Sequence, residues 1–494
     1  MDKIIVCGAG IGGMVTAIRL AHMGYEVEIY EKNISAGGKM GEYFESGFRF
    51  DTGPSILSMP YVFRDFFNDI GKNIDDYFKL IPLVNSCRYF WKDNTIFNAY
   101  TDSESIKEEI ISVFGKNEYN GFKDYLEYAE FFFDISEKNI LESEFKIKNF
   151  LNVKGIKNIN KFFSGKSIND LSNKFFTDPK LQQLFDRYST FNGSSPYLSP
   201  QIFSIIPYIE FKFGTCYVDG GIYKIAKALV RLCTEYNIKI NYGQRLKDIE
   251  FSSFKINKCF FEIGDNEMSE VTDFDLIVSN FTNNRKLAGK EYFKSSDWSN
   301  SGFFAIMGFD GVSENLSQHN ILFSDNYENE FIDIFEKKLP AEDMTVYISI
   351  SKKVHKEDAP EGMENWIVYV NALVVTDKFS WNEKHKFEYF DKIINKINSF
   401  NIIKDDLREK IKLFKIITPE DMMNMYGSEF GSIYGLSSNS LMTMFRRPKN
   451  RSDYYENLFF TGGNTHPGGG VPLCFLSGKI VSEMIYSDYK YSNQ

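Results

Sequence analysis

Glycines and one acid near the start of the chain have the types and spacing of a dinucleotide-binding loop. Gly8, Gly10 and Gly13 follow a short apolar stretch, and Glu31 ends the next one, 18 residues beyond Gly13. In such a loop the first glycine makes a tight turn, the second lets the backbone approach a pyrophosphate, and the third lets helix and strand pack closely. The pyrophosphate then lies at the positive end of the helix dipole. The carboxylate of Glu31 can accept both hydroxyls of an adenosine ribose, which disfavours NADP.

Further glycine-rich segments favour FAD over NAD as the ligand. Backbone suited to close approach recurs at 37–39, at 50–55 and, near the other end of the chain, at 459–472. The following residues are therefore predicted to bind the cofactor: Gly8, Ala9, Gly10, Gly12, Gly13, Glu31, Lys32, Gly38, Lys39, Gly53, Pro54, Ser55, Gly463, Asn464, Gly470, Val471 and Pro472.

Alternating strands and helices are expected to position these residues. The hydrophobic pattern predicts a strand at 3–7, a helix at 15–23 and a strand at 25–30, with a last helix at 477–486. Strands are also expected at 238–241, 246–251, 258–262, 303–309 and 345–350, the last two in a sheet that floors the substrate cavity. From Phe63 to about Ile140 the aromatic residues recur at helical spacing, which predicts helices there.

In these motifs the chain resembles the bacterial carotenoid (phytoene-type) desaturases, which are glutathione-reductase-like flavoproteins. The resemblance runs nearly from end to end, in order, through 219–222, 275–280, 431–435 and the tail. It implies an α/β fold, with a glutathione-reductase-like, FAD-binding Rossmann domain and a second α+β substrate domain inserted in the chain. It also adds Leu246 and Asn280 to the expected cofactor site.

A chain of 494 residues exceeds what a single core usually supports. Since the two ends share one site, the cofactor domain must be discontinuous. With the resemblance as a guide, residues 1–60, 214–295 and 425–494 are assigned to the FAD-binding domain, and residues 61–213 and 296–424 to the substrate domain.

The segment 187–197 looks most like the branch of the family that acts on hydroxylated carotenoids. The expected function is FAD-dependent formation of a carbon-carbon double bond in carotenoid biosynthesis, at the 3,4 position of a 1-hydroxylated acyclic end. Phytoene or C30 desaturation, flavin-dependent isomerisation or saturation, and an amine oxidase of the same superfamily stay open as alternatives. The non-enzyme alternative is an isoprenoid-binding escort protein.

No catalytic residue is assigned from the sequence. A hydride taken from an allylic carbon leaves a positive charge that spreads along the polyene, so a strong base is unnecessary, and the flavin supplies the difficult chemistry. His466 is either a base or a loop histidine held by backbone bonds. Asp186 and Arg187 either reach a substrate hydroxyl or, as the favoured interpretation, form an ion pair on a helix surface. Only one GxGxxG occurs, so an external electron acceptor, a quinone or oxygen, is expected.

Composition excludes several partners. The formal charge of −10 argues against nucleic acid, and six cysteines without CxxC spacing indicate neither a metal site nor disulfides. No apolar run is long enough to span a bilayer. The segment 145–166 holds six lysines and no acid among apolar residues, which fits either peripheral contact with an anionic membrane or a solvated cationic face. The expected location is cytoplasmic, on the inner face of the membrane, with a hydrophobic carotenoid as substrate.

Overall fold

The two ends of the chain meet in one parallel sheet. The structure, a computed structural model, describes residues 2–53, 55–144, 164–264, 267–281, 298–440, 443 and 446–490. The sheet has the order β10-β2-β1-β14-β20, and every neighbouring pair is parallel. Its strands are β1 (Lys3–Cys7), β2 (Glu26–Glu31), β10 (Lys239–Tyr242), β14 (Leu276–Ser279) and β20 (Leu458–Phe460). Strands β1 and β14 are apolar and buried on both faces, as parallel sheets require.

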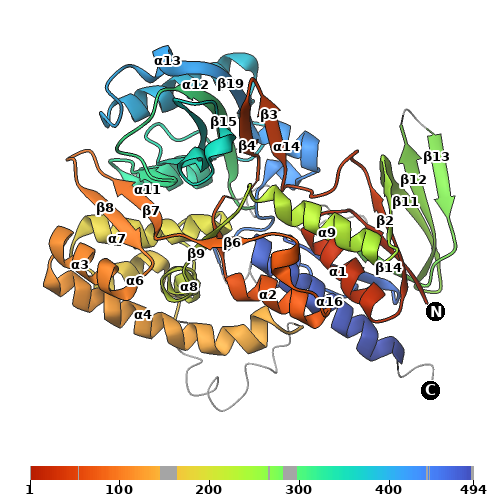
Figure 1. The fold of residues 1–494 in the computed structure, drawn as a ribbon. Coiled ribbons are helices and arrows are strands. Elements are labelled where there is room, and N and C mark those ends of the chain that lie inside the picture. Colours follow the sequence, from red (N-terminus) through yellow and green to blue (C-terminus); the bar gives the residue numbers. More distant parts are fainter. Residues whose placement is uncertain are drawn as a thin grey trace.

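Three helices cover this sheet: α1 (Ile11–His22), α9 (Tyr223–Glu235) and α16 (Val471–Lys490). Helices α1 and α16, from opposite ends of the sequence, lie side by side (Figure 1). A Cβ on Gly478 would lie 2.7 Å from Val15 Cγ1, so the glycine permits this close contact. Figure 1 also shows the antiparallel strands β11 (Gln244–Ser252), β12 (Lys255–Ile263) and β13 (Glu267–Val271) at one end of the molecule, beside β2.

A second, mostly antiparallel sheet lies at the other side, in the order β19-β15-β18-β17-β16-β7-β8. Its strands are β19 (Ile411–Ile417), β15 (Ser301–Asp310), β18 (Met363–Ala372), β17 (Val346–Ile350), β16 (His319–Leu322), β7 (Asn85–Phe90) and β8 (Ile96–Tyr100). Helix α12 (Glu383–Asn398) packs into its core, and Figure 1 shows that helix above the sheet. The strands predicted at 303–309 and 345–350 are thus confirmed as parts of β15 and β17.

Further helices are α2 (Pro60–Asp69), α3 (Ser103–Val113), α4 (Lys116–Ser136), α6 (Ile168–Phe175), α7 (Pro179–Asp186) and α8 (Ile205–Phe213), and the short helices α11 (Tyr327–Phe331) and α13 (Leu407–Lys410) lie later in the chain. The prediction of helix from Phe63 to Ile140 is wrong between α2 and α3, where β6 (Leu80–Pro82), β7 and β8 lie. Tyr89 and Phe97 are buried there by pairing between strands. Short apolar segments do not reveal by their period alone whether they will pair in this way.

One buried ion cluster joins the two sides of the molecule. Arg49, on β4 (Phe48–Asp51), donates to Asp51 at 2.5 Å and to Asp358 at 3.2 Å. Strand β4 pairs with β3 (Glu42–Glu45), while β5 (Leu57–Ser58) and β6 pair with β9 (Thr215–Val218). All strands of the parallel sheet fall within the ranges assigned to the FAD domain, and the exact division into domains stays a prediction.

None of the helices in the described ranges combines the length and the hydropathy needed to cross a bilayer. Residues 145–163, which carry most of the lysine-rich segment, lie outside the described residues.

Candidate active site

One cavity of about 1620 Å³ connects the glycine loop to the seven-stranded sheet. Gly10 and Glu31 lie in its wall at one side, and Phe304 and Tyr347 at the other. Pockets for one drug-sized ligand typically measure about 300 to 1,000 Å³. The cavity therefore has room for a dinucleotide and a second ligand together.

The glycine loop is built by close backbone contacts. A Cβ on Gly13 would lie 2.1 Å from the Gly8 carbonyl oxygen, and one on Gly12 would lie 2.7 Å from Gly462 Cα. Helix α1 therefore begins directly against β1 and against the tail loop. Gly10, the residue before the helix, has no side chain to cap it, so the amide groups of the first turn that are not bonded to Asn280 suit an anion.

Asn280 holds the glycine loop in place through hydrogen bonds of its side chain. With its amide turned to satisfy its neighbours, the side chain accepts from the Gly10 and Gly13 N–H groups at 3.2 Å and donates to the Thr461 carbonyl at 3.1 Å. Asn280 follows β14 and therefore ties the loop to both neighbouring strand ends. It also lines the cavity, as expected for a cofactor residue.

Glu31 is buried at the end of β2 with both carboxylate oxygens in hydrogen bonds. One oxygen accepts from the Ala9 N–H at 2.7 Å and the other from the Asn33 N–H at 2.9 Å. Each oxygen has a second acceptor site, so the carboxylate can still receive ribose hydroxyls.

We expect Glu31→Gln to weaken FAD binding by about tenfold, since a hydrogen bond to a charged group contributes about 1.5 kcal/mol or more. Titration of deflavinated protein with FAD, followed by flavin fluorescence, measures the change. Glu26→Gln, on the exposed start of the same strand, is the control and should leave the affinity unchanged.

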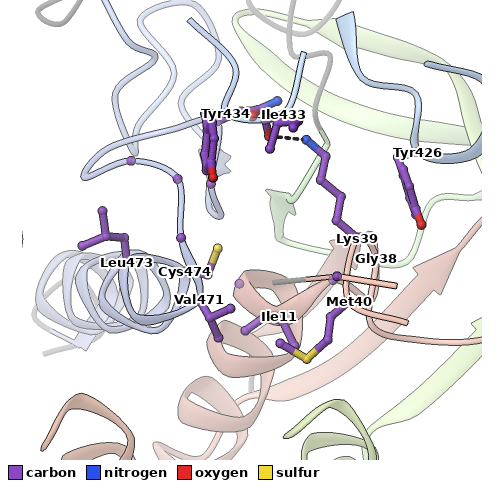
Figure 2. Close-up of a pocket in the computed structure, with 18 of the residues that line it drawn as sticks. Ile11, Gly38, Lys39, Met40, Tyr426, Ile433, Tyr434, Val471, Leu473 and Cys474 are labelled. Carbon is purple, nitrogen blue, oxygen red and sulfur yellow. Dashed lines mark hydrogen bonds between the residues drawn. The ribbon is translucent and has the colours of Figure 1, made fainter. Parts of the chain in front are cut away.

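Lys39 reaches across the cavity from the loop after β2. Its Nζ donates to the carbonyl oxygens of Ile433 at 2.7 Å and Ser432 at 3.3 Å. Figure 2 shows this bond, with Tyr434 and Tyr426 on either side of the lysine. Burial lowers the pKa of Lys39 to about 8.

This pKa predicts a pH dependence of flavin affinity. Lys39 carries its charge below about pH 8 and loses it above, so attraction for the anionic cofactor should weaken as the pH rises through 8. The Kd for FAD, measured from pH 6.5 to 9.5, should rise in the wild type and stay nearly flat in Lys39→Met. A slope that persists in Lys39→Met would assign the effect to another group.

The tail loop is held by backbone bonds. Arg447, which was not among the predicted cofactor residues, donates to the carbonyls of Tyr434, Leu436 and Gly463 at 3.0 to 3.2 Å. His466 is bonded through Nε2 to the Ser143 carbonyl at 2.9 Å, and burial lowers its pKa to about 4. The geometry therefore matches the loop-histidine interpretation, and we assign no catalytic base.

Most of the predicted cofactor residues line this one cavity. Pro54 lies outside the described residues, and Ala9 and Gly13 support the loop from behind. The residues in the cavity wall are Gly8, Gly10, Gly12, Glu31, Lys32, Gly38, Lys39, Gly53, Ser55, Leu246, Asn280, Gly463, Asn464, Gly470, Val471 and Pro472. Their roles toward FAD stay predictions.

The other half of the cavity is mostly apolar. Its wall comes from α8, the strands of the seven-stranded sheet and the segment around α14 (Pro419–Tyr426). The apolar side chains there are Ile140, Leu141, Ile202, Phe203, Ile205, Ile206, Ile209, Phe304, Ile306, Ile321, Ile367, Ile417, Met422 and Ile433. Such walls suit a long hydrocarbon and exclude water.

The favoured interpretation of Asp186 and Arg187 as a surface ion pair is wrong. Both side chains are buried, because the 3-10 helix η4 (Arg187–Asn192) turns inward after α7. Asp186 accepts from Asn169 at 2.7 Å and does not line the cavity, whereas Arg187 does. Glu210 also lines the cavity and had no sequence signal, because a single acid on an apolar helix looks like a surface residue.

Comparison with known proteins gives both family and fold. Residues 11–280 match the model of the flavin-containing amine oxidoreductases. The chain is 34% identical to a 1-hydroxycarotenoid 3,4-desaturase from a Flavobacterium species, over 98% of this chain and 99% of that protein. It is 30% identical to a 4,4'-diaponeurosporene oxygenase from Staphylococcus haemolyticus, over 98% and 97% of the two chains.

Two solved structures share the fold. An oxidoreductase from Methanosarcina mazei has a TM-score of 0.62 at 16% identity, covering 97% of this chain and 100% of that one. Putrescine oxidase bound to putrescine has a TM-score of 0.60 at 11% identity, covering 98% and 99%.

Fold and site together define a glutathione-reductase-like, FAD-dependent oxidoreductase. FAD is the cofactor, as the glycine-rich segments indicated. The chain belongs to the flavin-containing amine oxidoreductases and, within them, to the bacterial carotenoid desaturase family.

Proposed function

We propose that this protein is a carotenoid desaturase that forms the 3,4 double bond at a 1-hydroxylated acyclic end. The observation that carries the proposal is the continuous cavity that joins the flavin loops to an apolar channel holding a few buried polar groups. The relative with 34% identity bears the name of this reaction, and the match covers both chains almost completely.

When bound, FAD supplies the two-electron chemistry by accepting a hydride. The residues of this chain supply position and a dry environment. The apolar walls hold the polyene against the flavin loops and exclude water. His466, bonded to the Ser143 carbonyl, and Arg447, bonded to the Gly463 carbonyl, hold the tail loop in position.

Pigment analysis after co-expression tests the proposal. The chain is expressed with pathways that make either 1-hydroxylated or unhydroxylated acyclic carotenoids, and the pigments are analysed by absorption and mass. We expect a loss of two hydrogens and a red-shifted spectrum with the hydroxylated pigment. Conversion of phytoene or a C30 analogue instead would assign the protein to early desaturation, and an oxygen gained at a terminal methyl would assign it to the oxygenases.

Amine oxidation is the second candidate, because the family model and the putrescine oxidase fold both include it. The mostly apolar channel favours a hydrocarbon over a diamine. Peroxide release on addition of common amines would support this candidate.

We also propose that the protein works at the inner face of the membrane, where its substrate resides, and that an external quinone or oxygen reoxidises the flavin. The apolar substrate and the single dinucleotide motif support these two points. Reoxidation of the photoreduced protein by a soluble quinone, followed anaerobically at the flavin absorbance, distinguishes the two acceptors.

A further inference from the structure

Two opposite charges are buried in the wall of the cavity, away from the glycine loop. Arg187, on η4, is 6% exposed, and Glu210, on α8, is 4% exposed. Both line the cavity together with apolar residues of α8. Neither has a role in holding the cofactor loops described above.

The bonds of Arg187 hold it rigidly but leave bonding capacity. Its guanidinium lies 4.9 to 5.2 Å from the ring centres of Tyr89, Tyr188 and Phe191, and one terminal nitrogen donates to the Tyr89 hydroxyl at 2.7 Å. It makes no other side-chain hydrogen bond with the described residues, and its Nε is buried without a partner among them.

Glu210 is held in the same way. One carboxylate oxygen accepts from the Tyr188 hydroxyl at 2.9 Å, and the other has no hydrogen bond within the described part of the chain. Burial raises the pKa of Glu210, while the charge of Arg187 opposes that rise, so the two groups interact electrostatically. No ion pair within 4.0 Å joins them among the described residues.

Buried charges without full hydrogen bonding are costly, so both groups favour a ligand that completes their bonds. A hydroxyl donates one hydrogen bond and accepts others, whereas a carbonyl or an ether only accepts, and a hydrocarbon does neither. A hydroxyl is thus the end group that can accept from the guanidinium and donate to the carboxylate at once.

We propose that Arg187 and Glu210 bind the terminal hydroxyl of the substrate and so determine the preference for hydroxylated over unhydroxylated carotenoids. This inference rests on the proposed function, which it deepens by assigning the selection to two residues.

Arg187 and Glu210 line the same cavity as the residues predicted to bind the flavin. Tyr347 bonds both to Ser55, two residues after Gly53, and to His319, at 2.7 Å from its Nδ1. Burial and then the charge of Arg187 lower the pKa of His319 to about 3, so Arg187 acts electrostatically on this group of contacts. A Cβ on Gly53 would lie 2.8 Å from the Lys39 carbonyl, so Ser55 belongs to the flavin side of the cavity.

Binding and turnover, measured separately, test the inference. Kd values for a 1-hydroxylated acyclic carotenoid and its unhydroxylated counterpart are measured by quenching of protein fluorescence in detergent micelles, with KM and kcat from anaerobic flavin reduction. We expect wild type to bind the hydroxylated pigment about 10- to 100-fold more tightly, as charge-assisted hydrogen bonds allow. Arg187→Met and Glu210→Gln should each remove most of that preference and leave the Kd for the unhydroxylated pigment within about threefold.

Arg88→Met is the matched control. Arg88 is the β7 residue next to Tyr89, is bonded to Asn98 and the Asn315 carbonyl, and does not line the cavity. It should keep the full preference. Flavin content and melting temperature identify any variant that has failed to fold. In that case the ratio of the two Kd values, measured on the other variant, decides whether the site selects the hydroxyl.

The outcomes separate the two proposals. Selective binding that the substitutions abolish, without desaturation of the hydroxylated pigment, would support the hydroxyl site and overturn the reaction. Desaturation with a binding preference that survives both substitutions would keep the reaction and overturn the site. Equal binding of both pigments by the wild type would also overturn the site.

Discussion

Gly10→Val should give a folded protein that purifies without flavin. Gly10 has φ −73° and ψ 172°, a conformation that valine adopts readily, so the backbone has no need for glycine here. The added side chain would meet the Asn280 amide, 2.5 Å from an ideal Cβ, and would fill the surface that approaches the pyrophosphate. We expect a fall in FAD affinity of at least about 100-fold, or about 2.8 kcal/mol, with matching loss of activity.

The ratio of flavin to protein absorbance after purification measures this effect, and circular dichroism checks the fold. Ala21→Val, later on α1 and outside the cavity wall, should purify yellow. Gly13→Ala, in contrast, should fail to fold, because the added Cβ would lie 2.1 Å from the Gly8 carbonyl oxygen. A yellow Gly10→Val protein would contradict the role given to this loop.

Arg49→Met should destabilise the protein by about 3 to 5 kcal/mol, because it leaves buried carboxylates without their counter-charge. Asp358 is fully buried, Asp51 is 7% exposed, and the guanidinium donates to both. Burial already raises the pKa of Asp51 against the opposing charge of Arg49, and removal of that charge should raise it further. Urea unfolding at pH 7.5 measures the loss.

The sign of the pH effect follows from that pKa. A carboxyl whose pKa is higher in the folded state than in the unfolded state stabilises the fold more as the pH falls. The difference in free energy of unfolding between Arg49→Met and wild type should therefore be largest at neutral pH and shrink toward pH 5. Adding Asp51→Asn should recover a large part of the loss. Arg231→Met, at an exposed pair with Glu235, should change stability by no more than about 1 kcal/mol.

The sequence was enough to bring most of the predicted cofactor residues to one cavity wall, because local spacing determines their placement. Gly8, Gly10 and Gly13 act through the backbone of one turn, and Glu31 ends the adjacent strand. The strands at 303–309 and 345–350 could also be predicted from the sequence, since they are mostly apolar runs in a buried sheet.

The substrate half depends on contacts between distant residues and could be predicted only in part, because segment 187–197 and Arg187 were singled out and Glu210 was not. Arg187 and Glu210 line one cavity because η4 and α8 pack together, and nothing in either local pattern indicates that these charges are buried. For the same reason the strands at 85–100 were missed, as β7 becomes a strand by pairing with β16, more than 200 residues away.

The surface that supports the flavin loop is formed by both ends of the chain. Gly12 lies against Gly462, Thr16 bonds to Thr461 at 3.0 Å, and α16 packs along α1. During synthesis the glycine loop leaves the ribosome first, yet its contacts with Gly462, Thr461 and α16 are missing until β20 and α16 have followed. The complete surface under the flavin loop therefore forms only once β20 and α16 are available, and until then the apolar channel walls are exposed to aggregation.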